Sequence, residues 1–371
     1  MRAVDNIISA QDLRKSFPAR GKAGGKGGRA GQVSAVRGVT IEVARGEIFG
    51  FLGPNGAGKT TTLRMLTTLL PIGSGTATVA GFDVARQPGH VRSRIGYVSQ
   101  LGGADELATG RENLLLQGRL YGAPRAQVAP RAQALVELLD LADFADRRVA
   151  TYSGGQRRRL DIALGIVHEP PVIFLDEPTT GLDPQSRANL WDHIRELRAR
   201  GTTVFLTTHY LEEADLLCDR LMIMDHGQIV ADGTPRALKQ QVAGDAIVIS
   251  LRADGHGADK HSADKHGADN RDIDNHGAER AAPVLRAEPY VRELTADDGQ
   301  VRLYVDDGGT ALPQLIRLLD SRGIGIRSIS MSEPTLDDVF LRQTGRSMRD
   351  GGPGDGAPGS GPGSAHQEAA A

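Results

Sequence analysis

Apolar residues follow two kinds of pattern in the first two thirds of the chain. Short continuous apolar runs, typical of strands buried on both faces, predict strands at residues 47–52, 172–175 and 203–207. Helical spacing and bounding turn residues predict helices at residues 60–70, 109–120, 130–141, 185–200 and 211–217. We therefore expect an α/β fold. Shorter strands are predicted at residues 7–13, 39–43, 76–79 and 94–99, with a hairpin formed by 221–224 and 228–231.

The C-terminal third has a different pattern. Alternating strands at residues 247–251, 301–305 and 324–330, with helices at 312–321 and 333–341, predict a small α+β domain over residues 244–346. A degenerate five-residue repeat, His256 to Arg280, interrupts it. Histidine tracts can bind metal, but low hydrophobicity and spread charges favour a disordered insertion over 254–281. The Gly- and Pro-rich residues 347–371 predict a disordered tail.

The N-terminal domain, residues 1–243, contains a segment of nearly pure Gly, Ala, Lys and Arg at residues 19–31. We interpret it as a flexible insertion. Its basic side chains could instead meet lipid head groups or RNA, but the glycines leave no packed face. Because the net charge is only −2, no strong electrostatic signal favours nucleic acid as a partner. The single cysteine, Cys218, fits a reducing compartment. Without a long apolar run or signal peptide, we expect a soluble chain.

The strongest chemical signal lies between the strand at 47–52 and the helix at 60–70. There residues 53–60 fit G-x-x-x-x-G-K-[ST], the P-loop pattern, in which glycine N–H groups cradle phosphate oxygens at a helix N-terminus. Lys59 would reach the β- and γ-phosphates, and the Thr60 hydroxyl would ligate Mg²⁺. The expected ATP-binding residues of this loop are Gly53, Pro54, Asn55, Gly56, Ala57, Gly58, Lys59, Thr60 and Thr61.

Two further segments complete the nucleotide chemistry. The apolar strand at 172–175 leads to Asp176 and Glu177 at its carboxyl end, where open α/β sheets bind ligands. Asp176 would hold Mg²⁺, and Glu177 would orient or deprotonate the attacking water. A second anion-binding helix start is predicted at Ser153, Gly154, Gly155 and Gln156, although this tetrapeptide alone is a weak signal.

Taken in order, these motifs resemble the ATP-binding subunit of ABC transporters over about residues 7 to 240. Residues 53–60 are similar to that family's Walker A motif and 172–177 to its Walker B motif. Residues 152–156 are similar to its signature, with Tyr152 where leucine is usual. The resemblance implies a P-loop NTPase fold. Its RecA-like core would carry an antiparallel β subdomain and a helical subdomain, the latter at about residues 101–168.

The resemblance also implies roles for single residues. Phe17 would stack on adenine, Gln100 would touch Mg²⁺ or the lytic water, and His209 would hold the γ-phosphate and Glu177. Residues 181–183 are similar to the family's D-loop, and Asp183 there would contact the opposite subunit. Ser153 to Gln156 would close on the ATP of that subunit in a head-to-tail homodimer with two competent sites. ATP and Mg²⁺ are the implied cofactors.

Two stretches narrow the resemblance to the daunorubicin/doxorubicin-resistance ATP-binding subunits of bacterial exporters: residues 109–113, and 334–341 with 344–346. That family implies a separate multi-span membrane permease, a peripheral location on the cytoplasmic side of the membrane, and export of a hydrophobic drug. The apolar stripe of Leu336, Val339 and Phe340 either packs on the C-terminal domain or contacts another subunit, and the sequence leaves both open.

Two alternatives come from other classes. A non-transport ABC ATPase would act on ribosomes or DNA, yet the chain has one cassette, no long coiled coil and no strong basic face. A P-loop kinase would leave the signature and His209 unexplained.

Overall fold

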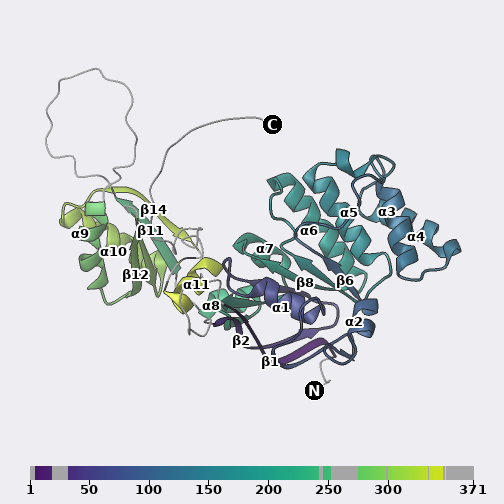
Figure 1. The fold of residues 1–371 in the computed structure, drawn as a ribbon. Helices are drawn as coiled ribbons and strands as arrows, with labels where there is room; N and C mark the ends of the chain where they lie inside the picture. Colours follow the sequence, from purple (N-terminus) through teal and green to yellow (C-terminus); the bar gives the residue numbers. More distant parts are fainter. Residues whose placement is uncertain are drawn as a thin grey trace, which may run out of the picture.

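The computed structural model describes residues 5–18, 32–241, 245–251, 275–297, 300–332, 334–345 and 347 (Figure 1). The predicted insertion at 19–31, the repeat up to residue 274 and the tail from residue 348 lie outside the described residues. Within the described part, no helix is long and apolar enough to cross a membrane.

A six-stranded sheet, ordered β10-β9-β3-β8-β7-β6, forms the centre of the N-terminal domain. Its inner strands are parallel, as the continuous apolar runs predict, and every residue of β3, β7 and β8 is buried. β9 and β10 form the predicted hairpin at one edge. The strands are β3 (Ile48–Leu52), β6 (Ile95–Val98), β7 (Val172–Asp176), β8 (Thr203–Thr208), β9 (Arg220–Asp225) and β10 (Gln228–Gly233).

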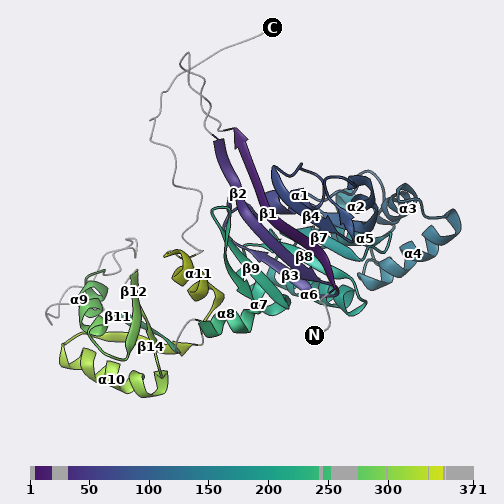
Figure 2. The ribbon, with the colours of Figure 1, turned by 90° about the horizontal axis from the view of Figure 1, so that it is seen from below.

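An antiparallel sheet, ordered β2-β1-β4-β5, lies next to this core. Figure 2 shows β1 and β2 as a long paired ribbon along the domain. Apolar residues of β1, β2 and β4 pack with Leu63 of α1 and with a cluster of phenylalanines, Phe49, Phe51, Phe174 and Phe205, on the central sheet. The elements are β1 (Asn6–Pro18), β2 (Gln32–Ala44), β4 (Ser74–Val79), β5 (Phe82–Asp83) and α1 (Lys59–Leu66).

Helix α1 is shorter than expected. The pattern predicted a helix to residue 70, but Thr68 adopts φ 64°, a left-handed conformation that interrupts α-helical geometry.

The helical subdomain contains α3, α4 and α5, with α6 and α7 nearer the central sheet (Figure 1). Helix α4 begins at Arg125, five residues before the predicted start, and Pro130 lies inside it. The strong helix formers before Pro130 explain the earlier start. The helices are α2 (Pro88–Arg94), α3 (Gly110–Leu120), α4 (Arg125–Leu138), α5 (Gly154–Ile166), α6 (Pro184–Ala199) and α7 (Leu211–Leu217), with a 3₁₀ turn, η1 (Val149–Thr151), before α5.

The C-terminal domain has its own antiparallel sheet, ordered β12-β13-β11-β14, and its own apolar core with α9 and α10. The expected disorder of 254–281 is wrong for its last residues, because 275–281 form the start of α9. Ala278, Ala281 and Leu285 of that helix are buried on the sheet. The elements are β11 (Asp245–Leu251), α9 (Asn275–Arg286), β12 (Val291–Asp297), β13 (Gln300–Val305), α10 (Gly308–Ser321) and β14 (Ile326–Ser332).

The apolar stripe of the last helix, α11 (Leu336–Thr344), packs within this chain. Leu336, Val339 and Phe340 are at most 2% exposed, in one cluster with Leu238 of α8 (Pro235–Gln241). Helix α11 thus faces the ATP-binding domain rather than only its own domain. The alternative contact with another subunit does not fit a stripe that is already buried.

Asp338 ties α11 to the C-terminal sheet. Its carboxylate accepts hydrogen bonds from Thr335 in a capping box, and from Tyr304 and Arg302 of β13. Since Asp338 is buried, these donors compensate its lost hydration.

Candidate functional site

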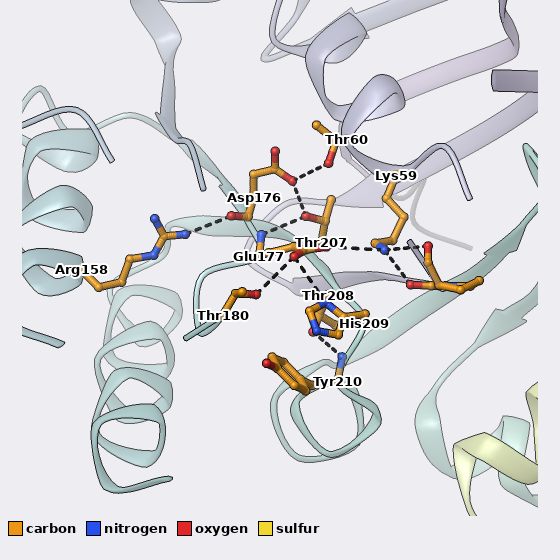
Figure 3. Close-up of polar contacts among 12 residues, drawn as sticks. Lys59, Thr60, Arg158, Asp176, Glu177, Thr180, Thr207, Thr208, His209 and Tyr210 are labelled. Atoms are coloured by element: carbon orange, nitrogen blue, oxygen red, sulfur yellow. Dashed lines mark hydrogen bonds and ion pairs between the residues drawn. The ribbon is translucent and has the colours of Figure 1, made fainter. Parts of the chain in front are cut away.

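Lys59 begins α1, directly after the loop that follows β3, as the P-loop pattern predicts (Figure 3). Its side chain is 4% exposed, and its ammonium donates to the carbonyl oxygens of Gly53 at 2.6 Å and Pro54 at 3.1 Å. Burial lowers the pKa of Lys59, while Glu177 and Asp176 oppose that shift. A Cβ on Gly53 would lie 2.2 Å from the Met224 carbonyl oxygen, so this loop position requires glycine.

Asp176, at the end of β7, is buried and held by two threonine hydroxyls. Thr60 Oγ1 donates to Asp176 Oδ1 at 3.0 Å, and Thr207 Oγ1 of β8 donates to the same oxygen at 2.7 Å. The pairing of β7 with β8 places Asp176 opposite Thr207. The Thr60 hydroxyl and the Asp176 carboxylate thus lie in contact, and both are oxygen groups of the kind that Mg²⁺ prefers.

Glu177 follows in a strained backbone conformation, with φ 47°. Its N–H donates to Thr207 Oγ1 at 3.0 Å and to the Thr207 carbonyl oxygen at 3.1 Å. Glu177 Oε2 lies 3.3 Å from His209 Nδ1 and accepts a hydrogen bond from Thr180 at 3.2 Å, while Oε1 lies 3.6 Å from Lys59 Nζ. Contact with His209, followed by the charge of Lys59, lowers the pKa of Glu177 despite its partial burial. This carboxylate is therefore held ionised.

A cavity of about 540 Å³ brings these groups together. It is lined by residues 54–61, and by Gln100, Glu177, Thr180 and His209, which come from separate segments of the chain. Ala35 of β2 also lines it, whereas Phe17 lies on β1 beside Val33, outside the lining. The stacking of Phe17 on adenine stays a prediction.

The segment from Ser153 to Gln156 lies outside this cavity's lining. Ser153 caps α5 by accepting from the Gln156 N–H at 3.3 Å, and the Gln156 side chain accepts from the Ser153 N–H at 3.0 Å. A Cβ on Gly155 would lie 2.8 Å from Ser186 Oγ, so the start of α5 adjoins the start of α6. Asp183 caps α6 and is exposed. Together, the starts of α5 and α6, with residues 153–156 and Asp183, form a second polar surface on the same chain.

Comparisons with known proteins agree with this geometry. A family model described as an ABC transporter matches residues 36–180, and one described as the C-terminal domain of DrrA1-3-like ATP-binding proteins matches residues 233–344. A daunorubicin resistance ATP-binding protein, DrrA2, of Streptomyces coeruleorubidus is 46% identical, over 85% of this chain and 92% of that protein. The chain belongs to the daunorubicin-resistance family of ABC transporter ATP-binding proteins.

Other matches cover larger or smaller shares of this ABC ATP-binding protein. The doxorubicin resistance ATP-binding protein DrrA of Mycobacterium tuberculosis is 39% identical, over 93% of this chain and 95% of that protein. A solved structure of an ATP-binding subunit of an ABC transporter is 28% identical, with TM-score 0.53, over 63% of this chain and 92% of its own. A model for an AAA domain, described as a putative AbiEii toxin, overlaps residues 146–215. The fold is that of an ABC ATPase, an enzyme that hydrolyses ATP.

Sequence reasoning missed the supporting roles of two residues of this ABC ATPase, Thr207 and Tyr152. The Thr207 hydroxyl contacts both Asp176 and Glu177. The only hint of this role in the sequence was the place of Thr207 at the end of a predicted buried strand. Tyr152, the departure from the usual leucine, donates from its hydroxyl to the Phe144 carbonyl oxygen at 2.7 Å and packs edge-on against the Phe144 ring. The tyrosine therefore anchors the signature segment to the helical subdomain.

Proposed function

We propose that this ABC ATPase is the ATP-hydrolysing subunit of a bacterial drug exporter, acting with a separate membrane permease. The convergence of Lys59, Glu177 and His209 on one cavity carries the proposal for the chemistry. The match of residues 233–344 to the DrrA-like C-terminal domain supports the drug-export branch.

In this proposal, ATP occupies the cavity with its phosphates in the P-loop. The Lys59 ammonium neutralises phosphate charge, and the loop N–H groups donate to phosphate oxygens. Thr60, Asp176 and Gln100 would hold Mg²⁺, which neutralises charge on the phosphates. Glu177, ionised and oriented by His209 and Thr180, accepts a proton from the attacking water or positions it in line.

The second polar surface supports ATP-driven dimerisation. Ser153 and Gly155 begin α5 with N–H groups and a hydroxyl at a helix N-terminus, which is an anion site. Because these residues lie outside their own chain's cavity, they are available to the ATP of a second copy. We propose a head-to-tail homodimer, with Asp183 at the contact and hydrolysis as the event that releases it.

Exposed leucines support a membrane-subunit partner on the helical subdomain. Leu101 follows Gln100 and is 95% exposed, Leu107 is 79% exposed, and Leu120 at the end of α3 is 72% exposed. Apolar side chains gathered on one subdomain favour a protein contact. We propose that a multi-span permease covers them and places the ATPase on the cytoplasmic face of the membrane.

An affinity-tagged Glu177→Gln chain, captured with ATP from native membranes, tests the partner. Recovery of a multi-span membrane protein, lost when Leu101 and Leu120 are replaced by serine, is the expected result. Recovery of ribosomes or DNA instead would favour the non-transport alternative. Daunorubicin accumulation in cells with and without the captured pair then tests the cargo.

A further inference from the structure

A buried arginine joins the signature helix α5 to the catalytic segments. Arg158 is 7% exposed, and its guanidinium donates to three backbone carbonyl oxygens: Pro178 at 2.7 Å, Ser99 at 2.6 Å and Asp176 at 3.0 Å. Figure 3 shows the Arg158 side chain reaching Asp176 from α5. The rigid, permanently charged fork of an arginine is suited to holding several acceptors in fixed positions.

Two of these carbonyls flank Glu177. The Asp176 carbonyl precedes it and the Pro178 carbonyl follows it, while Thr207 binds the N–H of Glu177 itself. These hydrogen bonds hold the backbone before, at and after Glu177, which adopts a left-handed conformation with φ 47°. Such a conformation persists only where surrounding contacts impose it.

The third carbonyl, that of Ser99, precedes Gln100. One turn further along α5, Asp161 is 6% exposed and accepts from the Gly103 N–H at 3.1 Å. A Cβ on Gly102 would lie 2.6 Å from Asp161 Oδ2, so the carboxylate packs directly on this loop. Residues three apart share one helix face, so Arg158 and Asp161 hold the loop of Gln100 at both ends.

We propose that Arg158 and Asp161 form a clasp that makes α5, the Gln100 loop and the Glu177 turn move as one unit. Arg158 is then a positioning residue for Gln100 and Glu177. Its own guanidinium stays outside the lining of the ATP cavity. The clasp predicts that losing Arg158 slows the chemical step while the P-loop still binds ATP.

Arg159 provides a matched control on the same helix. Its guanidinium also donates to backbone carbonyls, those of Leu139 and Asp140, and lies 5.1 Å from the Phe144 ring centroid. These partners belong to the helical subdomain. Arg159→Gln therefore removes the same charge and a set of carbonyl hydrogen bonds from the same helix without touching Gln100 or Glu177.

The test compares Arg158→Gln with Arg159→Gln in the full chain. Both kcat for ATP and Kd for ATP at the P-loop are measured, with thermal unfolding as the check on folding. We expect Arg158→Gln to lower kcat on the order of 100-fold, the effect of misplacing catalytic groups, with Kd unchanged. Arg159→Gln should keep its kcat, and Arg158→Lys should restore part of the rate by retaining the charge. The assay needs no membrane subunit, so its result is independent of the export proposal.

Equal kcat values for the two glutamine variants would overturn the clasp. A parallel loss of kcat and ATP affinity would also overturn it, because that pattern indicates general damage to the fold. If Arg158→Gln does not fold, Arg158→Lys against Arg159→Lys answers the same question. The double variant of Arg158→Gln with Asp161→Ala should be no slower than the slower single variant, and losses that multiply would contradict a single unit.

Discussion

Thr207→Val is the sharpest test of how the fold holds Asp176 and Glu177, the two carboxylates of the proposed site. Thr207 is fully buried on β8, and valine has nearly the same shape without the hydroxyl. The hydroxyl donates to Asp176 Oδ1 at 2.7 Å and accepts from the Glu177 N–H at 3.0 Å. The substitution therefore removes both contacts and disturbs little packing.

The expected loss of unfolding free energy follows from the groups that the Thr207 hydroxyl contacts. The hydrogen bond to Asp176 has a carboxylate acceptor, and losing such a bond costs about 2 kcal/mol of unfolding free energy. The Glu177 N–H keeps its second acceptor, the Thr207 carbonyl oxygen at 3.1 Å, so little is added for it. Because Asp176 and Glu177 lose their common support, kcat should fall at least about tenfold.

Thr203→Val on the same strand is the control. Thr203 is also fully buried, but its hydroxyl accepts only from the Gly46 N–H at 2.8 Å. Loss of one neutral hydrogen bond costs about 1 kcal/mol, and kcat should not change. Urea unfolding gives both free energies, and a phosphate-release assay gives both rates.

Equal destabilisation of the two variants, with kcat intact in both, would refute this reasoning. Thr207 would then be only a buried strand residue.

Three further predictions concern other parts of the chain. Ser153→Ala should weaken ATP-driven dimerisation, measured by sedimentation, while Kd for ATP at the P-loop stays unchanged. Loss of the helix cap should lower the free energy of unfolding by about 1 kcal/mol. Unchanged dimerisation would show that Ser153 is not part of the interface. Asp338→Ala should lower the free energy of unfolding in urea by about 2 kcal/mol, because buried Tyr304 and partly exposed Arg302 lose their charged partner, whereas exposed Asp320→Ala should not. The lowered pKa of Glu177 stabilises the fold above its ordinary pKa of about 4.3, and this stabilisation is lost as pH falls through the lowered folded pKa. His209→Ala should therefore flatten the decline of unfolding free energy below about pH 4.3, and an unchanged slope would exclude His209 as the main cause.

The sequence predicted the central sheet and the strand–loop–helix arrangement that leads to Lys59 well, because both have strong local signals. Continuous apolar runs identified β3, β7 and β8, and the P-loop spacing identified Lys59. Helix α9 was missed because its start lies in a polar repeat, and only its contact with the C-terminal sheet makes Ala278 and Ala281 buried. The local composition of this segment gives no indication of that contact, so the helix could not be predicted from it.

The residues that hold the site in place were harder to predict than the site residues themselves. Arg158 is the middle residue in a run of three arginines, a pattern typical of an exposed basic face. It is nevertheless buried, because its guanidinium donates to backbone carbonyls that are distant in sequence. One lies 59 positions before it, and two lie 18 and 20 positions after it. Thr207 depends similarly on the pairing of β7 with β8. Both roles arise from tertiary neighbours that are distant in sequence.

The central claim is that Glu177 performs hydrolysis while the P-loop and signature hold ATP between two copies of the chain. Glu177→Gln keeps the side chain's shape and removes its charge, so one sample with ATP and Mg²⁺ tests the claim through phosphate release and sedimentation. The account predicts phosphate release reduced at least about 100-fold and a dimer that persists while ATP is present. Undiminished phosphate release, or a monomer at saturating ATP, would contradict it.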